Sequence, residues 1–209
     1  MNIRNCIIII LCIILIYHLE IIYNLCDLEN EKIDNLETGD VLFMIDNHLL
    51  KGEFLKFITH NLLYSICTTL YTHVGVIFKM RNDMYLITAE NKNKCICIQK
   101  LLTYVKNYTG NIICFKNKNG IQNCNKKMYD FLNINKNKQY HNNLLSFLKI
   151  AFGFNGNFPI NKTICTKNAI ELLHLLGVNL NIDANCSDVK RFYNIITNSN
   201  CYCGPYLIL

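Results

Sequence analysis

Apolar residues recur along this chain with two different spacings, which divide it into predicted strands and predicted helices. Short apolar or β-branched runs between turn residues predict strands over 41–45, 72–79, 84–90, 95–99 and 111–116. Apolar positions three and four residues apart predict helices over 49–70, 100–107, 122–132, 165–176 and 187–196. The apolar tail over 202–209 predicts an edge strand. Because strands gather in the middle and helices toward both ends, the pattern favours an α+β fold over an alternating parallel sheet.

The first apolar run covers residues 6–19, carries no charge and follows Arg4. It is shorter than the roughly 20 residues that a membrane-spanning helix needs, and Glu20 interrupts it before more apolar residues follow. Because no small-x-small cleavage site follows, we favour an uncleaved hydrophobic membrane anchor over 1–25 rather than a cleaved signal peptide or a buried helix. We therefore expect a membrane-associated protein with a linker over 26–36 and one folded domain over 37–209.

Composition restricts the class of protein further. The 209 residues are 51% hydrophobic, 11% aromatic and 17% charged, which excludes a disordered chain and suffices for one well-packed core. The net charge is +6 and is uneven, since ten lysines and a single acid, Asp130, fall between Lys92 and Lys138. These lysines are scattered among asparagines without clustered aromatic residues, so a solvated surface is favoured and no nucleic-acid partner is expected.

The chain contains 12 cysteines but no Cys-x-x-Cys pair. The Cys-x-Cys pairs at Cys95/Cys97 and Cys201/Cys203 lack the spacing of structural zinc sites. We favour reduced thiols in a domain that faces the cytosol, with disulfides in an oxidising compartment as the alternative. Neither a metal nor an organic cofactor is expected, although a Cys/His metal protein stays open as a third class of function.

The predicted hairpin over 72–90 places two polar side chains together. If its turn centres on Arg81 and Asn82, His73 lies opposite Glu90, with Cβ atoms roughly 5 Å apart. At that distance a carboxylate can hold one imidazole nitrogen and fix the tautomer of the ring. Gly75 shares this face and would let another element approach closely. The alternative is an edge-strand histidine paired with a glutamate for solubility.

The predicted helix over 165–176 begins with a cysteine on its apolar stripe. A thiol at a helix N-terminus gains from the helix dipole and from unpaired amides, which lower its pKa and can also bind an oxyanion. The alternative is a buried structural cysteine. If this helix packs on the sheet face that carries His73, then Cys165, His73 and Glu90 supply a nucleophile, a base and a residue that orients the base.

Five segments together carry a family resemblance. The chain resembles the circularly permuted papain-like hydrolases of the NlpC type, and within them a branch that contains YiiX-like bacterial proteins and poxvirus relatives. The matching segments are Thr-Gly-Asp-Val-Leu-Phe at 38–43, Tyr-Thr-His-Val-Gly-Val-Ile at 71–77, Ile-Thr-Ala-Glu at 87–90, Gln-Tyr at 139–140 and the cysteine helix at 164–178.

The resemblance implies a permuted papain-like catalytic domain over 37–209, with a central antiparallel sheet and packed helices. It implies a thiol hydrolase or acyltransferase that acts on amide or ester bonds, and known relatives include enzymes that act on lipids. Cys165, His73 and Glu90 would then be catalytic. Asp40, Tyr71 and Tyr140 lie in the same segments and are candidates for supporting the site or binding substrate.

The leading hypothesis is therefore a cysteine-dependent enzyme whose substrate is an acyl-containing lipid or peptide. His73 removes the thiol proton, the thiolate attacks a carbonyl, and a thioester acyl-enzyme passes its acyl group to water or to a second acceptor. The alternative is a catalytically idle, membrane-tethered binding or virion protein with the same fold. An AT-rich source such as a virus would place the anchor in a viral or host-cell membrane.

Overall fold

The computed structural model describes the central and C-terminal parts of the chain almost continuously. The described residues are 12, 16, 25, 28–46, 71–90, 95–121, 124–141, 146, 149–150, 154–156, 158–186 and 188–208. Nearly all of the predicted anchor over 1–25, and the whole of the predicted helix over 49–70, lie outside them. Among the described residues, none of the helices has both the length and the apolar character that a membrane crossing requires.

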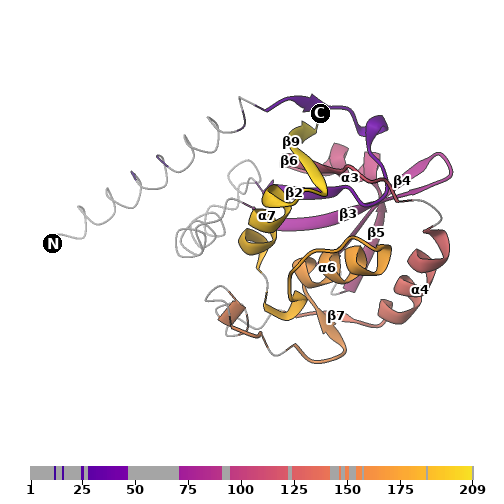
Figure 1. Ribbon diagram of the computed structural model, residues 1–209, viewed down its shortest axis with the longest axis vertical. Helices are drawn as coiled ribbons and strands as arrows, with labels where there is room; N and C mark the ends of the chain where they lie inside the picture. Colours follow the sequence, from indigo (N-terminus) through magenta and orange to yellow (C-terminus); the bar gives the residue numbers. More distant parts are fainter. Residues whose placement is uncertain are drawn as a thin grey trace.

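One sheet forms the centre of the described chain, with the strand order β1-β9-β6-β2-β3-β4-β5-β7-β8 (Figure 1). Its strands are β1 (Asn30–Glu31), β2 (Val41–Asp46), β3 (His73–Met80), β4 (Asp83–Glu90), β5 (Cys95–Lys100), β6 (Gly110–Asn117), β7 (Gln139–Tyr140), β8 (Lys162–Thr163) and β9 (Tyr202–Ile208). Neighbouring strands are antiparallel except β1 with β9 and β7 with β8. The predicted central antiparallel sheet is therefore confirmed.

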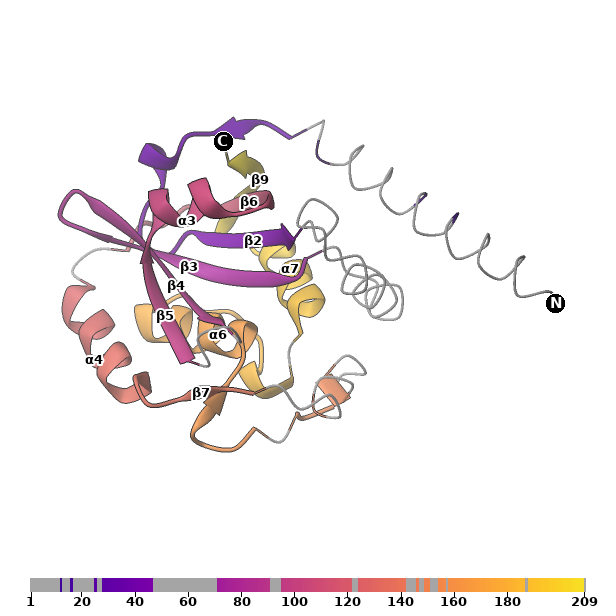
Figure 2. The same ribbon diagram turned by 180° about the vertical axis from the view of Figure 1, so that it is seen from behind.

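Helices cover both faces of this sheet. They are α3 (Leu101–Asn107), α4 (Asn125–Asn135), α6 (Cys165–Leu176) and α7 (Val189–Asn198). Leu101 of α3 packs in one buried cluster, and residues of α4, α6 and α7 pack in the other. Figure 2 shows where these helices lie around the sheet. The mixed α+β fold with packed helices is confirmed for the described chain, while the preceding hydrophobic helix stays a prediction.

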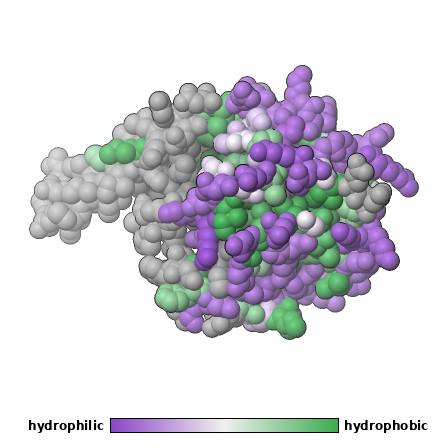
Figure 3. All heavy atoms as spheres, in the orientation of Figure 1, coloured by the Kyte–Doolittle hydropathy of each residue, from purple (hydrophilic) through white to green (hydrophobic). Residues whose placement is uncertain are grey.

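The strand β2 shows why this arrangement produces continuous apolar runs in the sequence. Successive side chains of a strand point to opposite faces. Val41 and Phe43 belong to the cluster on the α6 side, whereas Leu42 and Met44 belong to the cluster on the α3 side. Because both faces are covered, all four residues are buried. On the surface seen in Figure 3, hydrophilic residues dominate the described part, with apolar residues gathered near its middle.

The helix α6 has the predicted bounds, and local chemistry explains them. Its buried positions form the predicted apolar stripe against the sheet. It ends at Gly177, which adopts a left-handed conformation with φ of 93°. The N–H groups of Gly177 and Val178 then bind carbonyls of the last turn, those of His174 and Leu173.

Two predictions about the later elements have different outcomes. The helix predicted over 187–196 is α7, which begins two residues later, after Asp188, whose carboxylate accepts a hydrogen bond from the N–H of Arg191 at 2.7 Å and caps the helix. The predicted edge position of the C-terminal strand is wrong, because β9 lies between β6 and β1. The short β1 covers its outer edge through a parallel pairing of Asn30 with Leu207 and of Glu31 with Ile208.

Candidate active site

The thiol of Cys165 lies at the start of α6, in the buried cluster between that helix and the sheet. The backbone N–H groups of Val74, Thr166 and Cys165 itself bind the sulfur and act to lower its pKa. Burial has the larger, opposite effect and raises the pKa of this thiol to about 11, since the residue is only 4% exposed. The sequence-based expectation of a lowered pKa is therefore wrong for this structure, because desolvation outweighs the helix N-terminus.

The hairpin that carries His73 has the predicted turn and register. Arg81, with φ of 56°, and Asn82 form the turn, and the paired residues run from Met80–Asp83 to Val76–Ile87. The predicted pair of His73 and Glu90 lies three positions beyond the last of these pairs. His73 is in register with Met44 on its other side, in the neighbouring strand β2.

Beyond the Val76–Ile87 pair, toward the start of β3, the side chains of Cys165 and Thr88 bind the backbone of Val74. Its N–H binds the sulfur of Cys165, and its carbonyl oxygen accepts a hydrogen bond from Oγ1 of Thr88 at 2.7 Å. Oγ1 of Thr88 also lies 2.8 Å from Nε2 of His73. A continuous polar chain therefore runs from the thiol through Val74 and Thr88 to the imidazole, and the thiol binds the peptide group that joins His73 to Val74.

The helix α6 packs on a different face of β3 from the one that the sequence suggested. Its residues share a buried cluster with Val74 and Val76, whereas His73 pairs with Met44, which belongs to the α3 side. Strand alternation thus places His73, the first residue of β3, on the face opposite to Val74, next to the peptide N–H that binds the sulfur of Cys165. The space above Gly75 is taken by the side chain of Leu86 in the neighbouring strand and not by another element.

Glu90, the third predicted catalytic residue, ends β4 and is half-buried. It pairs in register with Cys95 of β5. The contact between its carboxylate and His73 stays a prediction.

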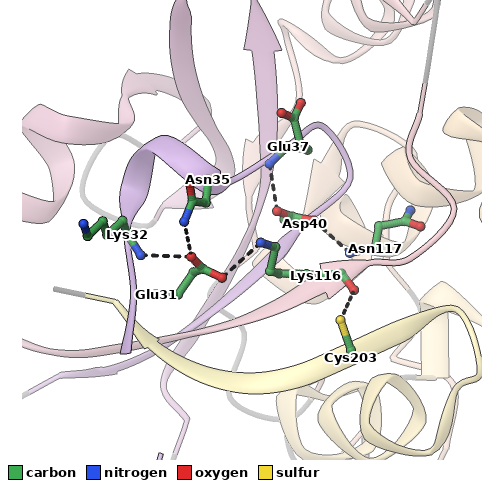
Figure 4. A network of polar contacts seen from close by, with 8 residues as sticks. All are labelled: Glu31, Lys32, Asn35, Glu37, Asp40, Lys116, Asn117 and Cys203. Carbon is green, nitrogen blue, oxygen red and sulfur yellow. Dashed lines mark hydrogen bonds and ion pairs between the residues drawn. The ribbon is translucent and has the colours of Figure 1, made fainter. Parts of the chain in front are cut away.

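Asp40 lies well away from these groups. Its carboxylate accepts hydrogen bonds from the N–H groups of Glu37 and Asn117, both at 2.8 Å (Figure 4). Its carbonyl oxygen accepts one from the N–H of Ile77, which is four residues from His73 along β3, or about 13 Å at roughly 3.3 Å per residue. Burial raises the pKa of this carboxyl to about 6. Asp40 therefore joins the turn before β2 to β6, and its role is structural.

Beside Asp40, an ion pair ties the N-terminal strand to the same region (Figure 4). The ammonium of Lys116 in β6 lies 3.0 Å from a carboxylate oxygen of Glu31 in β1. The hydroxyl of Tyr202 donates to the carbonyl of Gly39 at 3.0 Å. This end of the sheet is thus held by polar contacts between segments that are far apart in the sequence.

Tyr71 holds the chain just before His73. Its ring stacks on Tyr193 of α7 with centroids 4.4 Å apart, and it also contacts Phe43 at 5.5 Å. Burial and the hydrogen bond with Tyr193 raise the pKa of its hydroxyl. The next residue, Thr72, donates from its N–H to the carbonyl of Met44 at 2.9 Å. These contacts fix where β3 begins.

Tyr140 lies beside the short strand that leads into Cys165. It pairs with Thr163 in the short parallel ladder of β7 and β8, two residues before the cysteine. Thr163 is also bound through its carbonyl oxygen by the N–H of His141 at 2.8 Å. Tyr140 is half-buried, and its segment supports the strand that leads into α6.

Thr88 was not predicted as a site residue, because on the predicted strand it looks like an ordinary β-branched strand former. His141 was not predicted either. It is buried, its Nε2 lies 2.9 Å from Oγ of Ser146, and burial together with Lys162 and Lys167 lowers its pKa. In the first turn of α6, the side chains of Thr166 and Asn168 are fully buried. Oγ1 of Thr166 and both amide atoms of Asn168 find no hydrogen-bond partner within the described residues. No local pattern in the sequence distinguishes such groups.

Within the described part of the chain, free thiols are found at seven cysteines, namely 12, 97, 114, 124, 165, 201 and 203. The preference for reduced thiols stays a prediction. Within the described ranges, the structure holds no group of three or more His, Cys, Asp or Glu side chains that could bind a metal ion.

Among solved structures, the chain is similar to a protein described as the metalloprotein YiiX (DUF1105) from Escherichia coli O157:H7. The sequences are 13% identical, the TM-score is 0.48, and the similarity covers 83% of this chain and 88% of that one. No protein-family model matches the sequence, and no curated protein matches it. The likeness is one of fold alone, and the chemistry of the site has to be argued from the side chains of this chain.

Proposed function

We propose that the chain is a cysteine-dependent hydrolase or acyltransferase with a permuted papain-like fold, acting on an amide or ester bond in a lipid or peptide. One observation carries this proposal. The thiol of Cys165 binds the peptide group that joins His73 to Val74, at a helix N-terminus whose amides surround the sulfur. Acyl transfer requires a nucleophile, a base and oxyanion donors, and in this proposal Cys165 is the nucleophile, His73 is the base and the N–H groups at the start of α6 are the donors.

The reaction begins with the transfer of the thiol proton to His73 as the sulfur attacks the acyl carbon. The carbonyl electrons move to oxygen, and the N–H groups of Thr166 and Cys165 stabilise that charge. The carbon–oxygen or carbon–nitrogen bond of the substrate then breaks, and the leaving group takes the proton from the imidazolium. Water or a second acceptor, deprotonated by His73, releases the acyl group from sulfur. Glu90 completes the proposed site at the end of β4, and no metal or organic cofactor takes part.

A second candidate is a catalytically idle binding or virion protein that keeps the same fold. The specific observation in its favour is the burial of Cys165, because a thiol with a pKa of about 11 is protonated near neutral pH. In either case the N-terminal segment would attach the domain to a membrane.

The deciding experiment is labelling of the full chain with a thiol-reactive probe at about pH 5 to 9, with the labelled sites identified by mass spectrometry. Cys114 is the matched internal control, since it is also buried and burial raises its pKa well above the ordinary value. We expect Cys165 to react much faster than Cys114 in the wild type, and His73→Ala to remove that difference. His174→Ala, on an exposed position of α6, should leave it intact.

Equal labelling of Cys165 and Cys114 in the wild type would contradict the enzyme proposal and favour the binding protein. If the difference is present, a screen of lipid and peptide acyl substrates identifies the bond that is cleaved. Cys165→Ala should then abolish turnover while leaving the fold intact.

A further inference from the structure

We propose that Thr88 is a positioning residue that fixes the tautomer of His73, with the proton on Nε2 and the lone pair on Nδ1. The inference deepens the proposed function, on which its catalytic meaning rests. It begins from the two short contacts of one hydroxyl, since Oγ1 of Thr88 lies 2.7 Å from the carbonyl oxygen of Val74 and 2.8 Å from Nε2 of His73.

Counting hydrogen atoms determines the direction of both hydrogen bonds. A threonine hydroxyl has one hydrogen to donate, and a carbonyl oxygen can only accept. The hydrogen between Thr88 and Val74 therefore belongs to Thr88, and its hydroxyl has none left for His73. Nε2 of His73 must then carry the hydrogen that it shares with Oγ1, so that Thr88 is the acceptor.

The assignment has a direct chemical consequence for the imidazole. When Nε2 carries the proton of the neutral ring, Nδ1 carries the lone pair and is the nitrogen that would take the thiol proton in the proposed reaction. The hydrogen bond to Thr88 does not change when Nδ1 gains its proton, because Nε2–H is the donor in both forms. Thr88 therefore holds the ring in one orientation throughout the cycle.

The surroundings of Thr88 suit this role. The residue is 1% exposed, so no water competes for the two contacts, and it is paired in register with Cys97 of β5. Thr88 also connects the two reacting residues through Val74. Its hydroxyl donates to the carbonyl oxygen of Val74, and the N–H of Val74 binds the sulfur of Cys165. The predicted orienting residue, Glu90, lies two positions further along the same strand.

The test measures the tautomer directly by long-range proton–nitrogen NMR of the full chain with 15N-labelled histidine, His73 being assigned from the signal lost in His73→Gln. We expect the wild type and Thr88→Ser to show His73 with the proton on Nε2. Thr88→Val, which keeps the shape but lacks the hydroxyl, should show a mixture of the two tautomers. Tyr85→Phe is the matched control, because it also removes one hydroxyl from the same strand, and it should leave the ring as in the wild type.

A wild-type ring with the proton on Nδ1, or a Thr88→Val ring identical to the wild type, would overturn the inference. The labelling rate of Cys165 near neutral pH is the second readout. Thr88→Val should lower it by roughly tenfold, the factor expected for one hydrogen bond, and Thr88→Ser should restore it. Failure of the proposed function would show separately, as wild-type labelling that does not depend on His73, while the NMR result still decides the role of Thr88. A thermal melt of each variant shows that it is folded.

Discussion

Cys165 and Asp40 are each bound by backbone N–H groups that favour a negative charge, yet burial raises the pKa of both side chains. For Cys165 this keeps the thiol protonated until a base removes its proton, so the reactivity that we propose has to come from His73. For Asp40 it creates a dependence of stability on pH, because the pKa of the carboxyl differs between the folded and the unfolded chain.

The pH dependence from Asp40 has a definite sign. Its pKa rises from 3.8 to about 6 on folding, so the folded state retains a proton that the unfolded chain has lost between these values. The stabilisation is complete below about pH 4 and is lost as the pH rises through 6, with an upper limit of about 3 kcal/mol. Urea unfolding of the wild type at pH 4 to 7 should show this loss. Asp40→Asn should show a flatter profile, and parallel profiles would contradict the prediction.

At the level of single residues, the sequence was sufficient to predict that a helix begins at Cys165 and that His73 lies on a hairpin. The turn at Arg81 and Asn82 sets the register by local geometry, and the apolar stripe after Cys165 is a local pattern. Thr88 and the burial of the thiol could not be predicted in the same way. Both depend on where the β3–β4 pairing stops and on how deeply α6 packs, and these are properties of the assembled sheet.

Among the features of the helices and strands, the residues at which helices begin and end are the ones that local chemistry determines best in this chain. The bounds of α6 agree with the prediction because an apolar stripe stops at a glycine, and α7 begins after its Asp188 cap. The face of the sheet on which a helix packs was less predictable. The sequence shows that α6 has an apolar face, but which face of β3 receives it depends on the covering of both sides of the sheet.

The glycine at the end of α6 offers a test at this scale. A Cβ added at Gly177 would have no heavy atom within 4 Å, so the cost of Gly177→Ala comes from the left-handed backbone alone. We expect a loss of about 1 kcal/mol in the free energy of unfolding, measured by chemical denaturation. Gly177→Asn should lose less, because asparagine tolerates this conformation better. An unchanged stability in the alanine variant would mean that the helix ends differently.

For the molecule as a whole, one aromatic group joins the sheet to α7. Phe43 of β2 contacts Phe115, Phe192 and Tyr193, with ring centroids 5.8, 5.6 and 5.4 Å away. Phe43→Ala should lower the free energy of unfolding by about 3 to 5 kcal/mol through loss of burial and creation of a cavity. The matched control is Ile98→Ala in β5, whose side chain is 48% exposed and should cost far less. Equal losses in the two variants would contradict this account of the core.

The parallel pairing of β1 with the end of β9 determines how mechanical force enters the domain. Asn30 and Glu31 lie beside Leu207 and Ile208, and the N–H of Leu207 binds the carbonyl of Glu29 at 2.8 Å. A pull on the chain that precedes Glu29 therefore loads this short ladder first, and the C-terminal strand next to it. The strand that bears His73 lies four places away in the sheet order. Tension on a tethered domain would thus strip β1 from the sheet before it disturbed the geometry around Cys165.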